Sequence, residues 1–131
     1  MTQVVDASAV VAALTDNGDE ARWCEDRLIE HALAAPHLMP FEVANIVRRL
    51  VGRRALDQTA GADAIEALTR LRVSLIPFEA LSDRVWQLRD NLTSYDASYV
   101  AAAELLGCRL VTLDRGLAAA PGTTCEIMVA P

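Results

Sequence analysis

Short apolar runs that alternate with longer helical segments are the feature that most restricts the fold of this chain. Strands are predicted at residues 3–5, 33–38, 73–78, 109–113 and 125–129, and helices at 7–14, 20–31, 40–51, 56–72, 79–92 and 94–106. Strands that alternate with helices favour a parallel sheet joined by right-handed crossovers. The sequence therefore predicts an α/β sandwich around a parallel sheet.

The length and the composition predict a single ordered domain. The chain has 131 residues, of which 53% are hydrophobic, and it contains no low-complexity tract or long block of like charge. A chain of this length can bury a full core, and such a composition is not typical of disorder. No repeat or linker is visible, so residues 1–131 are expected to form one domain.

The charge composition excludes several classes of function. The formal net charge is −6, so the chain is not expected to bind nucleic acid through an overall positive field. Any nucleic-acid binding would require a local group of basic residues. All 12 basic residues are arginine. Without lysine the chain has neither a nucleotide-binding P-loop nor a Schiff-base enzyme site. The Gly-rich dinucleotide motif and the serine-hydrolase motif are also absent.

The cysteines and histidines do not have the spacing of a metal or redox site. Cys24, Cys108 and Cys125 are expected to be buried free thiols in a reducing cytoplasm, since no signal peptide precedes the first strand. His31 and His37 are expected to be structural or surface residues. The apolar runs are too short to cross a bilayer, so no membrane span is expected.

Acidic residues occur where predicted strands end and predicted helices begin. Asp6 and Asp114 directly follow strands, while Glu42 and Asp96 lie in the first turns of helices. In a parallel sheet, strand ends and the helix starts that follow them lie at the same edge, where ligands bind. The four carboxylates are therefore expected to lie near one another.

Helix capping is an alternative explanation for each acid taken alone. Asp6 and Asp114 are placed to cap the helices that follow them, and Thr93 with Asp96 resembles a capping box. Glu42 is favoured by the dipole of its helix. Capping does not require the acids to converge, however, and converging carboxylates repel one another. Binding of a hard divalent cation does require convergence, and all-oxygen ligands favour Mg²⁺ or Mn²⁺.

Four stretches of the chain resemble a known family. These are VVDASAVVAAL at 4–14, PFEVANIVRRL at 40–50, TSYDASYVAAAELLGCRLVTLD at 93–114 and RGLA at 115–118. In order and spacing they are similar to PIN domains, and more narrowly to the VapC toxins of bacterial toxin–antitoxin pairs. The resemblance implies a three-layer α/β/α sandwich and a Mg²⁺-dependent ribonuclease, with Mn²⁺ able to substitute. It also implies a homodimer that a VapB-like antitoxin inhibits.

The resemblance assigns roles to particular residues. Asp6 and Asp96 are expected to be the main metal ligands, and Glu42 and Asp114 to complete the site directly or through water. The other assigned residues are polar side chains expected near the metals, namely Ser8, Asn45 and Thr112. For the two hydroxyls the alternative is a hydrogen bond to nearby backbone.

A polar stripe on the helix of Glu42 is expected to provide the local group of basic residues that RNA binding requires. At about 100° per residue, Asn45, Arg49 and Arg53 fall on the same side as Glu42, and the valines and leucine of the helix face the core. The two arginines lie roughly 10 and 16 Å beyond Glu42, a spacing that suits RNA phosphates. The alternative is an ordinary solvated helix face, or ion pairs across the dimer. Trp23 and Trp86 are expected in the core, with a groove or dimer contact as the alternative.

Three other functions are compatible with parts of this pattern. A phosphotransfer receiver also places acids at strand ends, but it requires a lysine. A metal-dependent single-stranded DNA nuclease is the nearest enzymatic alternative. A catalytically silent interaction module of the same fold is the alternative without catalysis, and the complete set of four acids argues against it.

An inhibitor is expected to insert an arginine into the acidic site while an amphipathic segment binds an apolar groove.

Overall fold

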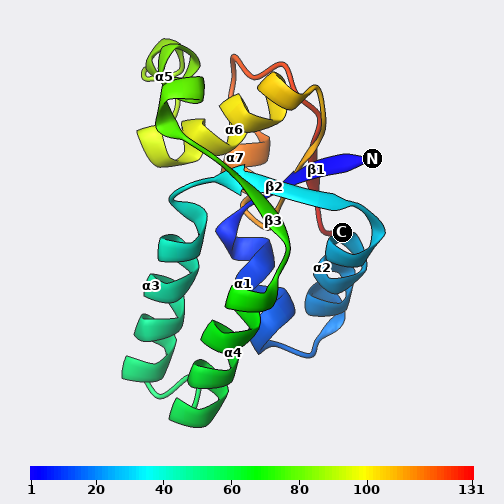
Figure 1. Cartoon of the computed structure of the whole chain (residues 1–131), viewed down its shortest axis with the longest axis vertical. Helices are drawn as coiled ribbons and strands as arrows, with labels where there is room; N and C mark the ends of the chain where they lie inside the picture. Colours follow the sequence, from blue (N-terminus) through cyan, green and yellow to red (C-terminus); the bar gives the residue numbers. More distant parts are fainter.

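The structure is a computed structural model that describes all of residues 1–131. A parallel five-stranded sheet has the order β3-β2-β1-β4-β5 (Figure 1). The strands are β1 (Thr2–Val5), β2 (Ala32–Pro36), β3 (Val73–Ile76), β4 (Leu110–Thr112) and β5 (Ile127–Val129). The helices are α1 (Ala7–Thr15), α2 (Asp19–Glu30), α3 (Met39–Gly52), α4 (Gln58–Arg70), α5 (Phe78–Gln87), α6 (Ser94–Leu106) and α7 (Arg115–Ala118).

Helices cover both faces of the sheet, which confirms the three-layer α/β/α prediction. The chain moves from β1 to β2 to β3 in one direction and then returns to β4 and β5 on the other side of β1. Because crossovers are right-handed, this reversal sends the later helices to the opposite face. Figure 1 shows α1 to α4 on one side of the sheet and α5 to α7 on the other.

The central strands and α6 form the core. Val4 and Val5 of β1 and Leu110 and Val111 of β4 are fully buried, as expected for strands covered on both faces. Residues 97–103 of α6 are also buried and are mostly alanine. Small side chains let this helix approach the sheet closely, and α6 contacts β1, β2 and β4. The helix thereby places its first turn beside the ends of β1 and β4.

Several predicted boundaries were wrong for local reasons. Strand β3 stops at Ile76, because Pro77 becomes the N-cap of α5 and Phe78 is its first residue. Helix α5 ends at Gln87 rather than at residue 92. Helix α2 begins at Asp19, one residue before the predicted start, with Gly18 as its N-cap, and Asp19 forms an ion pair with Arg22.

Some expected burials differ in the structure. Trp23 is half-buried under the guanidinium of Arg27, whereas Trp86 is 67% exposed, so the core assignment of Trp86 was wrong. All three cysteines are free as expected, but only Cys24 is buried and the other two are half-buried. No helix combines the length and the apolar character that a bilayer span requires.

Candidate active site

Asp6 and Thr112 meet where the chain reverses direction across the sheet. Val5 of β1 pairs with Val111 of β4, so the residues that follow these two strand positions are neighbours. The Thr112 hydroxyl donates to Oδ2 of Asp6 at 2.6 Å, and the Asp6 backbone N–H donates to the Val111 carbonyl at 2.9 Å. A crevice forms at such a reversal point in parallel sheets and commonly holds ligands.

Ser8 completes the surroundings of Asp6. Its hydroxyl donates to Oδ2 of Asp6 at 2.9 Å and accepts from the backbone N–H of Leu113 at 3.0 Å. The Ser8 and Thr112 hydroxyl oxygens are 3.4 Å apart. Both hydroxyls therefore donate to a carboxylate oxygen, and each also accepts a nearby backbone N–H, so the alternative of a backbone bond describes only part of their bonding.

The Asp6 side chain does not cap the helix that follows it. The Asp6 backbone occupies the N-cap position of α1, but its carboxylate makes no capping hydrogen bond. The residue is only 8% exposed. Burial raises the pKa of Asp6, the hydrogen bonds from Thr112 and Ser8 lower it, and the negative charge of Asp114 raises it. Capping thus does not explain this acid.

Glu42 projects from the first turn of α3 and accepts a hydrogen bond from the Tyr99 hydroxyl. Burial raises the pKa of Glu42, the Tyr99 hydrogen bond lowers it, and the charges of Asp6 and Asp96 raise it. The Tyr99 ring is fully buried within α6. Tyr99 was missed from the sequence, although it lies one helical turn after Asp96 and therefore on the same helix face.

Asp96 lies in the first turn of α6, where Thr93 is the capping residue. The Thr93 hydroxyl accepts the Asp96 backbone N–H at 3.1 Å, while the Asp96 carboxylate makes no hydrogen bond. The predicted reciprocal capping box is therefore only half-formed. Burial raises the pKa of Asp96, and the charges of Asp6 and Asp114 raise it further. This carboxylate is available for a ligand.

Asp114 has a capping role, as its alternative explanation predicted. One carboxylate oxygen, Oδ1, accepts the Leu117 backbone N–H at 3.1 Å at the start of α7. The Asp114 backbone N–H donates to the Thr112 hydroxyl at 3.0 Å, which fixes the residue next to the crevice. Its second carboxylate oxygen, Oδ2, makes no hydrogen bond within the chain.

The four acids form one electrostatic cluster. Asp96 interacts with the charges of Asp6 and Asp114, and Glu42 interacts with those of Asp6 and Asp96. The chain contains 12 arginines, yet none of its ion pairs involves any of these carboxylates. Their hydrogen-bond donors are neutral hydroxyls and backbone amides. Such donors orient a carboxylate without cancelling its charge, so the donor set fits a hard divalent cation.

The spacing of the acids also restricts how a cation could be held. No group of three His, Cys, Asp or Glu side chains is close enough together to hold one ion directly. Mg²⁺ commonly retains several waters and contacts only one or two carboxylates. The arrangement therefore fits a hydrated ion with some of the acids acting through water.

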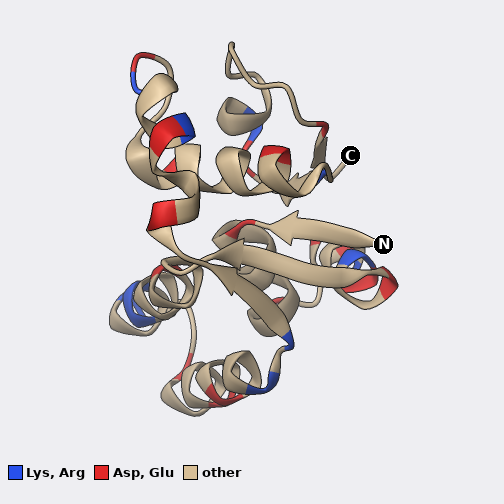
Figure 2. Ribbon diagram, turned by 45° about the horizontal axis from the view of Figure 1, so that its top comes forward, with Lys and Arg blue, Asp and Glu red and all other residues tan.

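The polar stripe of α3 is only partly directed at the site. Asn45 is exposed, and its side-chain oxygen accepts a hydrogen bond from Arg48 at 3.0 Å instead of pointing at an acid. Arg49 and Arg53 are exposed and form no ion pair, and Arg53 is the C-cap of the helix. Val43 and Val47 face the core as predicted. In Figure 2 the arginine colour marks part of α3.

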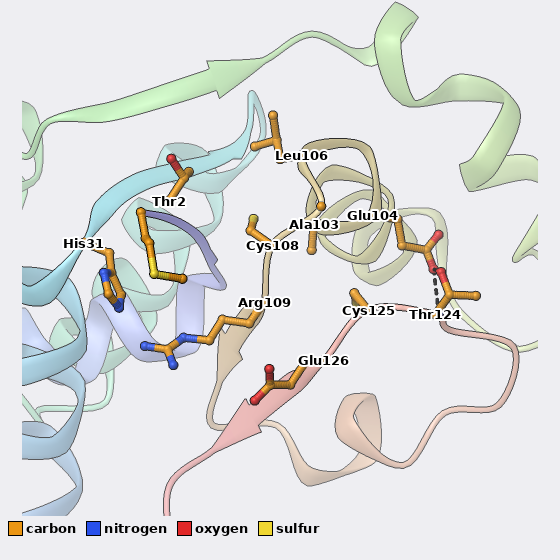
Figure 3. Close-up of a pocket in the computed structure, with 12 residues that line it drawn as sticks. Thr2, His31, Ala103, Glu104, Leu106, Cys108, Arg109, Thr124, Cys125 and Glu126 are labelled. Atoms are coloured by element: carbon orange, nitrogen blue, oxygen red, sulfur yellow. Dashed lines mark hydrogen bonds between the residues drawn. The ribbon is translucent and has the colours of Figure 1, made fainter.

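Cavities lie beside the acids and at the opposite edge of the sheet. A groove of about 420 Å³ between α1 and α3 begins at Ser8 and is lined by Val11, Ile46 and Leu50. A larger cavity of about 620 Å³ lies at the starts of β1, β4 and β5, away from the acids (Figure 3). Its polar side chains include Glu104, which is already bonded to Arg84 and Thr124. The larger cavity is therefore not the candidate site.

Comparison with known proteins gives one consistent result. The family model described as PIN domain matches residues 4–122. The chain is 43% identical over 128 residues to VapC ribonuclease Mb0985 of Mycobacterium bovis, with 98% of both chains covered. It is also 43% identical over 125 residues to ribonuclease VapC1 of Mycobacterium tuberculosis, covering 95% of this chain and 94% of the relative.

Solved structures share the fold. The structure of PAE2754 from Pyrobaculum aerophilum superposes with a TM-score of 0.71 at 29% identity, over 97% of this chain and 83% of the other. VapBC-5 from Mycobacterium tuberculosis, described as a member of a toxin–antitoxin family, superposes with a TM-score of 0.64 at 17% identity, over 98% of both chains.

Proposed function

The chain belongs to the PIN-domain family, and on that basis we propose that it is a Mg²⁺-dependent endoribonuclease, the toxin of a toxin–antitoxin pair. The observation that carries the proposal is the cluster of four carboxylates without a cationic partner at the reversal point of the sheet. The identity to proteins named VapC ribonucleases supports RNA as the substrate.

Each acid has a distinct part in the proposed reaction. Asp96, whose carboxylate makes no hydrogen bond, and Asp6, which two hydroxyls orient, would hold Mg²⁺ or Mn²⁺. Glu42 and the free oxygen of Asp114 would bind the waters around the ion. The metal supplies an activated water and neutralises charge on the phosphoryl oxygens. Ser8 and Thr112 keep the Asp6 carboxylate oriented during this reaction.

The substrate strand is proposed to leave the site along α3. Arg49 and Arg53 are free of ion pairs and can bind phosphates on one side of the cleaved bond. The side-chain oxygen of Asn45 is bonded to Arg48, so Asn45 is assigned no phosphate contact. Contacts of this kind position the strand without reading its sequence.

A VapB-like antitoxin is the proposed inhibitor. The groove between α1 and α3 starts at Ser8 and continues along Val11, Ile46 and Leu50, so an apolar segment bound there would end at the acids. An arginine at the end of that segment could form charge-assisted bonds with the unpaired carboxylates. VapBC-5, a structural relative, is described as a toxin–antitoxin family member.

A homodimer is proposed on the basis of exposed apolar side chains near the site. Phe41 on α3 is 79% exposed and Phe78 on α5 is 65% exposed, and each lies at a helix start at the carboxyl edge of the sheet. Large exposed aromatic side chains are typical of protein interfaces.

The experiment that tests the function compares substrates and metals. Purified protein is incubated with total RNA and with single-stranded DNA in Mg²⁺, in Mn²⁺ and in EDTA. Cleavage of RNA in either metal and none in EDTA is expected. Cleavage of DNA alone would support the DNA nuclease, and no cleavage of either would support the silent interaction module.

A further inference from the structure

Glu42 is held by a side chain from a different helix. The hydroxyl of Tyr99 on α6 donates to Oε1 of Glu42 on α3, although 57 residues separate them in the sequence. The Tyr99 side chain is fully buried, so its position is set by the core. The bond therefore ties a half-buried carboxylate to the buried core of the molecule.

One face of α6 contributes twice to the site. Asp96 and Tyr99 are three residues apart, and at about 100° per residue they project from the same side of the helix. Asp96 presents a carboxylate with no hydrogen bond, and Tyr99 presents a donor to Glu42. The relative position of the Asp96 and Glu42 carboxylates is thus set by one turn of a buried helix.

A hydroxyl donor has a chemical consequence that an arginine would not have. It occupies Oε1 and restricts rotation of the carboxylate, but it leaves the negative charge in place. Oε2 of Glu42 remains without a hydrogen bond and is free to serve a cation or its water. Ser8 and Thr112 likewise donate hydrogen bonds to the Asp6 carboxylate and leave its negative charge in place.

We infer that Tyr99 is a positioning residue of this site, whose hydroxyl orients Glu42 for the divalent cation. The inference rests on the proposed function, since it concerns the same carboxylates. It predicts that the hydroxyl of Tyr99 matters only while Glu42 is present. A purely structural tyrosine would contribute equally whether or not Glu42 is there.

The direct test is Tyr99→Phe, which keeps the buried ring and removes the hydroxyl. Mn²⁺ affinity is measured from the loss of the electron paramagnetic resonance signal of the free ion. Both this affinity and kcat on RNA are expected to fall about 10- to 100-fold. The control is Tyr95→Phe, the same change at the only other tyrosine, which is exposed on the same helix. This control is expected to match the wild type in both measurements.

A double-mutant cycle separates positioning from structure. In a Glu42→Ala background, Tyr99→Phe is expected to cause no further loss of Mn²⁺ affinity or kcat. An equal additional loss in both backgrounds would overturn the inference. Mn²⁺ binding can be measured without RNA. A wild-type protein that binds Mn²⁺ but does not cut RNA would therefore refute the proposed function, while the Mn²⁺ affinities of the variants would still test the role of Tyr99. Failure of the wild type to bind Mn²⁺ would refute the inference.

The hydrogen bond itself is observable by NMR. In the Tyr95→Phe protein Tyr99 is the sole tyrosine, and its buried, bonded hydroxyl proton is expected to exchange slowly with water. That resonance is expected to disappear in the Glu42→Ala variant. Its persistence there would show that another group accepts the bond, and the inference would fail.

Discussion

The hydroxyl of Thr112 donates a 2.6 Å hydrogen bond to the carboxylate of Asp6 across 106 residues of sequence. The same hydroxyl accepts the backbone N–H of Asp114 at 3.0 Å. One threonine thus connects two acids of the site and joins the ends of β1 and β4. Its contribution to the site can be measured without changing any charge.

Thr112→Val replaces this hydroxyl with a methyl group of similar size. Asp6 keeps Ser8 as its only side-chain donor, so metal-dependent cleavage is expected to fall about 10- to 100-fold. The free energy of unfolding is expected to fall by about 1–3 kcal/mol, because buried polar groups lose their partner. Urea unfolding and cleavage assays measure both effects. Thr15→Val, which removes a hydroxyl bonded to the Val11 carbonyl within α1, is the control and should retain activity.

Asp96→Asn removes a charge and leaves the Thr93 cap intact. Metal-dependent RNA cleavage is expected to be abolished, because this is the carboxylate most available to the ion. Stability without metal is expected to be unchanged or higher, since repulsion from Asp6 and Asp114 is relieved. Wild-type cleavage by this variant would show that the site is wrongly assigned. Asp63→Asn, on the exposed surface of α4, is the matched control.

The pH dependence of stability follows from the raised pKa values of Asp6, Glu42 and Asp96. A raised carboxyl pKa means that the folded state binds protons more readily than the unfolded state. These groups therefore contribute most below their unfolded pKa of about 4, and the contribution is lost as pH rises through the folded values. In EDTA, the three acids should make the protein less stable at neutral than at mildly acidic pH.

Mg²⁺ is expected to reverse this effect, because it binds the deprotonated acids. The shift in Tm on adding Mg²⁺ should be large at neutral pH and should decrease as the solution is acidified. Thermal unfolding with Mg²⁺ and with EDTA across this pH range provides the measurement. A Tm shift that does not depend on pH would contradict metal binding at these carboxylates.

Arg49→Glu tests the proposed path of the RNA strand. With Ca²⁺ in place of Mg²⁺, RNA binding should weaken, and its salt slope should flatten by about one unit for each lost phosphate contact. Arg22→Glu is the control, since Arg22 is exposed on α2 but already paired with Asp19. An unchanged slope for the Arg49 variant would identify this arginine as ordinary surface.

Leu50→Arg tests the groove between α1 and α3. The new side chain would fill an apolar groove with charge, so inhibition by the proposed VapB-like antitoxin should be lost while RNA cleavage remains. Inhibition assays with increasing antitoxin measure the change. The matched control is Leu105→Arg, at an exposed leucine on α6 that does not line this groove, and full inhibition is expected. Inhibition of the Leu50 variant at wild-type antitoxin concentrations would exclude this groove.

Local patterns made much of the fold predictable. Each strand was identified because a short apolar run precedes a turn or a helix start, and Asp6 and Asp114 could be placed because they follow such runs directly. The errors were also local. Pro77 ended β3 early because proline begins helices well, and Trp86 remained exposed where hydrophobicity alone favoured burial.

Long-range contacts could not be read from the sequence. The pairing of β1 with β4 and the bond from Tyr99 to Glu42 join residues far apart in the chain, and no local pattern encodes them. The orientation of Asn45 was missed for a different reason. Arg48, one turn away on the same helix, donates a hydrogen bond to the side-chain oxygen of Asn45.

The position of β4 beside β1 has a consequence for biosynthesis. Asp6 enters the chain long before Thr112 and Asp114, and the strand that carries Asp6 gains its β4 partner only after β3, α5 and α6 have been made. A chain still emerging from the ribosome without β4 therefore lacks the hydroxyl that orients Asp6 and one of the four acids. The complete set of four acids, with Asp6 oriented by Thr112, therefore cannot form before Asp114 has been made.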